Sequence, residues 1–174
     1  MGFSKEDFAD EGEQLFHYGR LYTDYRCVAR SVNTFAAPKK EALFSSGIEV
    51  VTPSSGETAE DIAIASAIVS PGIMLGSGLN IIRPYPGLDP VFLALSISGG
   101  PQHLDLAKRA QGKSIVHLYT NDLADSQLML SKQVTEQREI GRLFDSLDDL
   151  ITLRQRELDR KTKGNQQHHP LAPR

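Results

Sequence analysis

The sequence contains a single cysteine, Cys27, among 174 residues. One thiol cannot build an internal disulfide framework, and it cannot supply the several sulfur ligands of a cysteine zinc cluster. No apolar run approaches the ~18 residues that a membrane-spanning helix requires. The acidic start, residues 1–7, lacks the apolar segment of a secretory signal peptide. These absences predict a soluble cytosolic protein.

An overall excess of basic charge is also missing, since the formal net charge is -3 and the isoelectric point is about 5.9. This balance argues against a protein that binds nucleic acid through a uniformly basic surface. The charges are unevenly spread, however. Residues 16–41 carry five basic and two acidic side chains, whereas residues 1–13 carry one basic and five acidic side chains. Because affinity for phosphate depends on where charges lie, residues 16–41 are a candidate basic patch.

Residues 1–130 consist of short apolar segments separated by glycine, proline and serine, which is typical of a domain with long loops. Pro90 and Pro101 stand where a first helical turn accepts proline. No repeat of the kind that builds solenoids or propellers is present. We therefore expect an α+β fold, a mixed α/β domain with a twisted sheet. Its expected strands are 48–52, 73–75, 79–84 and 114–118, and its expected helices are 90–98 and 101–110.

Residues 135–163 differ from the rest because they are densely charged, contain no proline and include only one glycine, Gly141. This composition predicts one long C-terminal α-helix of the coiled-coil type, roughly 40 Å in length. Such a helix is too long for the small domain to cover, and the chain offers no second long helix. We expect residues 164–174 to form a disordered tail. The apolar residues of the helix follow the spacing of a helix that packs along another helix, and they are Ile140, Phe144, Leu147, Ile151 and Leu158.

The sequence gives little support for catalysis or for ion binding. Cys27 paired with His17 or His117 would suit a hydrolase, but no signature surrounds this cysteine, and a structural role is favoured. Residues 112–114 resemble the end of a phosphate-binding loop, yet Ala107 stands where that motif requires glycine. We expect neither a metal nor another cofactor, because no histidine lies at ligand spacing from the acidic residues of an earlier loop, Glu57, Glu60 and Asp61.

Several separated motifs together resemble one family of proteins. Residues 136–158, which begin EQREIGRLF, closely resemble the C-terminal conserved region of the specificity (S) subunits of type I restriction–modification systems. Four upstream segments resemble the target recognition domain of the same subunits. They occur in the same order as in the family, and they are HYGRLYT (17–23), PSSGET (53–58), LNIIRP (79–84) and QGKSIVHLY (111–119).

The resemblance implies a DNA-recognition subunit that is not itself an enzyme. In that family, two target recognition domains each recognise one half of a bipartite DNA site. Two long antiparallel helices hold these domains apart and dock methyltransferase subunits, which in turn recruit the restriction subunit. This chain has one domain, residues 1–130, and one spacer helix, residues 135–163. It is therefore expected to be half of such a subunit, whether a natural half-subunit, the remnant of a split gene or an excised fragment.

The same resemblance, together with a cluster of tyrosine and arginine side chains, suggests which residues bind DNA. Arginine side chains fit guanine edges and phosphates, and loop side chains of this domain would contact the bases. Lysine on phosphate would instead strengthen binding to every sequence alike. The expected DNA-binding residues are Tyr18, Arg20, Tyr22, Arg26, Lys39, Lys40, Ser54, Ser55, Glu57, Thr58, Lys113, Ser114 and His117.

An alternative function remains open at this point. The protein could be mainly an assembly module that pairs through its C-terminal helix, with itself or with another half-subunit, and that has lost DNA binding. The mass in solution and a titration with DNA separate the two functions, since a dimer that ignores DNA would support assembly alone.

Overall fold

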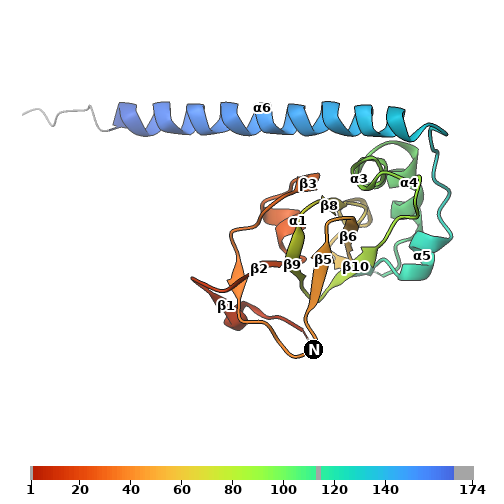
Figure 1. Ribbon diagram of the computed structural model, residues 1–174, viewed down its shortest axis with the longest axis horizontal. Coiled ribbons are helices and arrows are strands. Elements are labelled where there is room, and N and C mark those ends of the chain that lie inside the picture. The colour runs from red at the N-terminus through yellow and green to blue at the C-terminus, as the bar shows by residue number, and fades with distance from the viewer. Residues whose placement is uncertain (1, 113–114, 167–174) are drawn as a thin grey trace, which may run out of the picture.

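The computed structural model describes residues 2–112 and 115–166. The chain forms a mixed α/β domain followed by one long helix, α6 (Val134–Gln166), which lies along one side of the domain and extends beyond it (Figure 1). The expected fold class, an α+β domain with a long C-terminal helix, is confirmed. The helix begins one residue before the predicted start at 135. It includes residues 164–166 of the predicted tail, and the rest of that tail lies outside the described residues.

Three sheets form the domain where we expected one. The five-stranded sheet has the order β1 (Phe8–Ala9), β4 (Phe35–Ala36), β2 (Glu13–Phe16), β9 (Pro71–Leu75) and β5 (Leu43–Ser46). The four-stranded sheet has the order β10 (Leu79–Ile82), β6 (Glu49–Pro53), β8 (Ser66–Ile68) and β3 (Val28–Ala29). A small third sheet pairs β11 (Val116–His117) with β7 (Ser55–Gly56).

The four-stranded sheet lies in the middle of the domain and is buried on both faces. All five residues of β6 are buried, and neighbouring residues point to opposite sides. Val50 contributes to the core beneath helices α3 (Pro90–Ser98) and α4 (Gly100–Arg109), whereas Val51 packs toward the five-stranded sheet. β6 is not a continuous apolar run, because Glu49 and Thr52 are buried in it, and its sequence signal is the β-branched residues 50–52.

Four short helical segments lie outside the three helices that we expected. These are a 3-10 turn (Lys5–Asp7), α1 (Arg20–Thr23), α2 (Ala59–Ile62) and α5 (Thr120–Ala124). The predicted helix at 90–98 is confirmed as α3, where Asp89 accepts hydrogen bonds from the N–H groups of Val91 and Phe92 at 3.0 and 3.1 Å. The predicted strand at 114–118 is shorter, since β11 covers only 116–117, and residue 114 lies outside the described residues.

Candidate functional site

Three of the segments singled out in the sequence meet at one place. Ser55 of β7 lies opposite His117 of β11 in an antiparallel pair, and the Tyr22 hydroxyl donates a hydrogen bond to the Ser55 carbonyl at 3.1 Å. Gly56 makes this approach possible, because a Cβ at that position would lie 2.8 Å from the Tyr22 hydroxyl oxygen. Segments far apart in the chain therefore form one surface, which we call the loop surface.

The environment of Tyr22 keeps its hydroxyl protonated. Burial, followed by the nearby carboxylate of Asp61, raises the pKa of Tyr22 to about 12. The phenol therefore donates to Ser55 throughout the physiological range. The Tyr22 hydroxyl thus stabilises the turn at residues 54–56, although Tyr22 is 41% exposed.

Tyr18 lies at one margin of the loop surface and is 46% exposed. Its ring covers Gly78, where φ is +76° and an added Cβ would lie 3.1 Å from the Tyr18 ring. The Gly78 carbonyl accepts a hydrogen bond from the Ser54 N–H at 2.9 Å, and the Ser54 carbonyl accepts one from the Leu118 N–H at 3.2 Å. These bonds tie the start of β10 to the loops that carry Ser55 and His117.

Tyr119 is a member of the loop surface that the sequence reasoning did not select. Its ring stacks on His117 with the ring centroids 5.9 Å apart and an angle of 20° between the planes. The side chain is 53% exposed. Alternation along the extended segment was the available signal, because residues 117 and 119 point to the same side of a strand.

Two other predicted residues in this region have different surroundings. Thr58 is the N-cap of α2, and its hydroxyl accepts a hydrogen bond from the Asp61 N–H at 3.0 Å while donating to the Asp61 carboxylate at 2.6 Å. Glu57 is exposed beside it. Lys113 and Ser114 lie outside the described residues.

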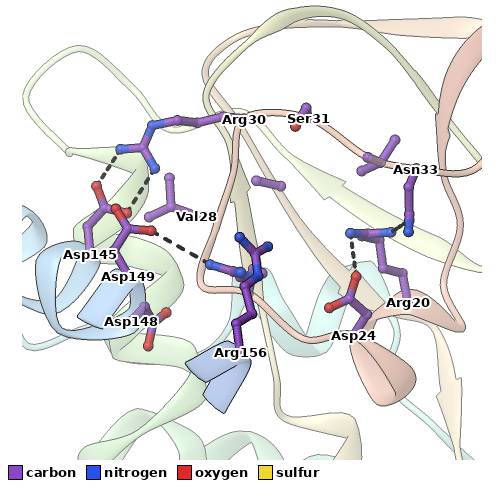
Figure 2. A pocket seen from close by; sticks show the side chains of 13 residues that line it. Arg20, Asp24, Val28, Arg30, Ser31, Asn33, Asp145, Asp148, Asp149 and Arg156 are labelled. Carbon is purple, nitrogen blue, oxygen red and sulfur yellow. Dashed lines mark hydrogen bonds and ion pairs between the residues drawn. The ribbon is translucent and has the colours of Figure 1, made fainter. Parts of the chain in front are cut away.

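Arg20 (Figure 2) and Arg26 line a cleft between the domain and α6, and none of the residues that form the loop surface lines this cleft. Arg20 donates to the side-chain oxygens of Asn33 and Asp24, both at 2.6 Å, and only 11% of its side chain is exposed. Arg26 lies 3.7 Å from the Asp149 carboxylate of α6. Both guanidinium groups therefore already have oxygen partners within the protein.

The two lysines of the candidate basic patch lie elsewhere again. Lys39 donates to the Asp7 carboxylate and to the Gly2 carbonyl, each at 2.8 Å, and it lies 4.8 Å from the centre of the Phe3 ring. The hydrogen bond from Lys39 lowers the pKa of Asp7. Lys40 is exposed. The basic residues of 16–41 thus divide into two groups, because Arg20, Arg26 and Arg30 line the cleft, each beside a carboxylate, whereas Lys39 and Lys40 are not among its lining residues.

The surroundings of Cys27 do not favour a hydrolase. The side chain is buried in the main core, and burial, together with the charge of Asp148, raises the pKa of Cys27 to about 12. A thiol in such surroundings stays protonated near neutral pH, whereas a nucleophilic cysteine requires a lowered pKa.

The apolar face of α6 is not the face that contacts the domain. The domain side of the helix is made of Gln137, Gly141, Asp145, Asp148 and Thr152, which are buried or half-buried. From helical geometry, the apolar row lies about 90° around the helix from these residues. Its most exposed members, each between 43% and 56% exposed, are Phe144, Leu147, Ile151 and Leu158, while Ile140 is half-buried. Within the described part of the chain, no helix is long and apolar enough to cross a membrane.

No protein-family model matches the sequence, and no curated protein matches it either. The fold is similar to that of two solved structures. The first is the crystal structure of a type I restriction–modification S subunit from M. genitalium, with a TM-score of 0.56, 19% identity, and coverage of 91% of this chain and 38% of that one. The second is the HsdS subunit from Thermoanaerobacter tengcongensis, with a TM-score of 0.54, 14% identity, and coverage of 90% and 35%.

The chain therefore spans little more than a third of the length of these two structures. Their similarity at this level of identity concerns the fold. The resemblance that the sequence motifs indicate is confirmed in three dimensions, because the chain has the fold of one segment of a type I S subunit, a mixed domain followed by a long helix.

Proposed function

We propose that this protein is a sequence-specific DNA-binding half of a type I specificity subunit and that it is not itself an enzyme. The observation that carries the proposal is the loop surface, where Tyr22, Ser55 and His117 come together from three separate segments. Each of these segments carries a motif that resembles the target recognition domain. The similarity of the fold to two S subunits supports the same function.

Direct contacts to bases would come from the exposed polar and aromatic groups of the loop surface. Tyr18 and Tyr119 are exposed there, and the half-buried His117 ring and Ser55 hydroxyl lie beside them. Hydrogen bonds and apolar contacts to base edges carry sequence information. Arg20 and Arg26 stay candidates for DNA contact, but each would first have to leave a carboxylate partner. Lys39 and Lys40, which lie apart from the loop surface, stay candidates for phosphate contacts, which set register and salt dependence.

The test begins with selection of bound duplexes from a random pool, followed by titration of a selected duplex by fluorescence anisotropy. We expect Tyr18→Ala to raise the dissociation constant for the selected duplex about ten-fold, as expected for one lost base contact. Binding to an unselected duplex should change little.

Tyr85→Ala is the matched control for Tyr18→Ala. Tyr85 is 59% exposed and follows the far end of β10, whereas Gly78, beneath Tyr18, precedes its start. This variant should bind the selected duplex like the wild type. The proposal fails if the wild-type protein enriches no sequence, or if both variants weaken binding to selected and unselected DNA alike.

The exposed apolar face of α6 supports the second part of the proposal, which concerns partners. An apolar row of this length on a helix requires a facing helix. We propose a second copy of the chain, or another S-subunit half, as the partner in the helix pair. Methyltransferase subunits, and through them the restriction subunit, would join that assembly in the cytoplasm and would be directed to one half of a bipartite target. If the wild type is a dimer that binds no DNA, the assembly-only alternative is correct.

A further inference from the structure

The long helix is fixed to the domain first near its own N-terminus. Gln137, 1% exposed, accepts a hydrogen bond from the Asp89 N–H at 2.8 Å and donates to the Gly87 carbonyl at 3.3 Å. One turn later, Gly141 packs on Val91, where an added Cβ would lie 3.2 Å from a methyl carbon of that valine. This first anchor places the start of α6 across the N-terminus of α3.

A second contact follows on the same face of α6, and it consists of charged groups. The Arg30 guanidinium donates two hydrogen bonds to the Asp145 carboxylate (Figure 2), one of them at 2.9 Å. Arg26 lies 3.7 Å from Asp149. Asp145 and Asp149 are four residues apart, so they lie one above the other along the helix. Arg26 and Arg30 flank β3 and point to the same side.

The arginines are held on a rigid support. The Arg26 carbonyl accepts a hydrogen bond from the Ser66 hydroxyl at 2.5 Å, and the Cys27 and Ala29 carbonyls accept from β8 and the residue after it at 2.8 and 3.1 Å. Both residues of β3, Val28 and Ala29, are buried. The backbone from which both arginine side chains extend is thus fixed by the central sheet.

If these ion pairs are lost, no apolar side chain on the domain side of α6 beyond Gly141 remains to hold the helix against the domain. Beyond Gly141, the half-buried helix residues on the domain side are Asp145, Asp148 and Thr152, and residues 153–162 are all exposed. From Gly141 to the end of α6 the helix runs about 37 Å, so a tilt of about 10° around the first anchor would move its far end by about 6 Å. A contact placed two turns along the helix can prevent such a tilt.

We propose that Arg26 and Arg30 are positioning residues that clasp Asp149 and Asp145 and so fix the angle of α6 against the domain. The clasp determines the direction in which the apolar face of α6 points relative to the loop surface. This inference does not depend on the proposed DNA binding, and its test uses the protein without DNA.

The test measures the distance between two spin labels, one at Lys108→Cys on α4 and one at Arg160→Cys on α6, in a Cys27→Ala background. Both labelled positions are exposed. The sample is diluted with unlabelled protein, so that distances between two copies do not contribute. We expect a single narrow distance distribution for the clasped protein. In about 1 M salt, where the Debye length is about 3 Å, the Arg26–Asp149 pair at 3.7 Å should weaken more than the hydrogen-bonded Arg30–Asp145 pair, so we expect the distribution to broaden only in part.

Charge reversal makes the test specific for the clasp. Arg30→Asp should replace the narrow distribution with a broad one, and the double variant Arg30→Asp with Asp145→Arg should restore the narrow one. Arg156→Gln is the matched control, because Arg156 lines the same cleft but has no ion-pair partner among the described residues. It should keep the narrow distribution.

The proposal is overturned if Arg30→Asp leaves the distribution unchanged, or if the reversed pair fails to narrow it. It is also overturned if Arg156→Gln broadens the distribution as much as Arg30→Asp does. Circular dichroism of each variant should show unchanged helix content, because the clasp residues are at the surface.

Discussion

The domain buries apolar side chains in its core, whereas the long helix exposes its apolar side chains and turns polar ones toward the domain. In the domain, apolar residues from both larger sheets and from α3 and α4 are buried against one another, and a buried carboxylate, Glu49, has a full set of donors. In α6, the buried positions are Gln137 and Gly141, while the apolar side chains are exposed. The domain is therefore complete in itself, whereas the helix still has a surface to bury. This difference is why recognition is assigned to the domain and pairing to the helix.

The largest expected loss of stability follows from a substitution in the interior of the domain, at Glu49. Burial alone would raise the pKa of Glu49, but hydrogen bonds from the Ser46 hydroxyl and from the N–H groups of Ser46 and Ile48 outweigh it and hold the pKa at about 2. Glu49→Gln removes the charge that these donors stabilise. We expect a loss of about 3 kcal/mol in the free energy of unfolding at pH 7, measured by urea titration.

The pH dependence of Glu49 gives an internal check. Its pKa is lowered in the folded protein, so its contribution to stability is present above the ordinary value of 4.5 and is lost as the pH falls toward 2. The difference between wild type and Glu49→Gln should therefore shrink over that interval. A difference that stays constant would contradict this assignment.

A smaller loss of stability is expected from a substitution at the junction of the domain and α6. Gln137→Ala leaves the N–H of Asp89 without its partner, which costs about 1–3 kcal/mol. We expect faster hydrogen exchange in the first three turns of α6 and unchanged exchange in the central sheet. Gln155→Ala, at an exposed position of the same helix, is the control and should change neither. Faster exchange throughout the domain would show that the two regions are not independent.

A substitution on the apolar face of α6 should have the smallest effect on the free energy of unfolding, but it should abolish dimer formation. Leu147→Glu places a charge on an exposed row, so the free energy of unfolding of a monomer should change by less than about 0.5 kcal/mol. Light scattering should give a dimer for the wild type and a monomer for Leu147→Glu. Leu153→Glu, about 120° around the helix from Leu147, should stay dimeric. A monomeric wild type would assign the face to a partner of different sequence.

The sequence predicted the elements whose signal is local. Pro90 marked the start of α3, the predicted strand at 48–52 corresponds to β6, and the charge-rich segment without proline marked α6. The short strands β1, β3 and β4 have two residues each, which is too short for a periodic pattern. They form because distant strands provide their hydrogen-bonding partners.

Part of the candidate site was predictable, because sequence motifs are local signals, whereas contacts between distant segments are not. Motif order selected Tyr22, Ser55 and His117, and the structure brings these three together. The bond from Arg20 to Asn33 and the pair of Arg26 with Asp149 were not predictable, because these residues become neighbours only through the tertiary fold. The direction of the apolar face was not predictable either. The spacing of the apolar residues places them in one row on the helix, but it does not determine which side of the helix contacts the domain.

Selection from a random duplex pool with the Leu147→Glu variant tests the central claim most directly, because it asks whether the domain recognises DNA without the helix pair. We predict that this monomer enriches one short sequence and that the dimeric wild-type protein enriches two copies of that sequence. If neither protein enriches any sequence, the domain does not read DNA, and the central claim is wrong.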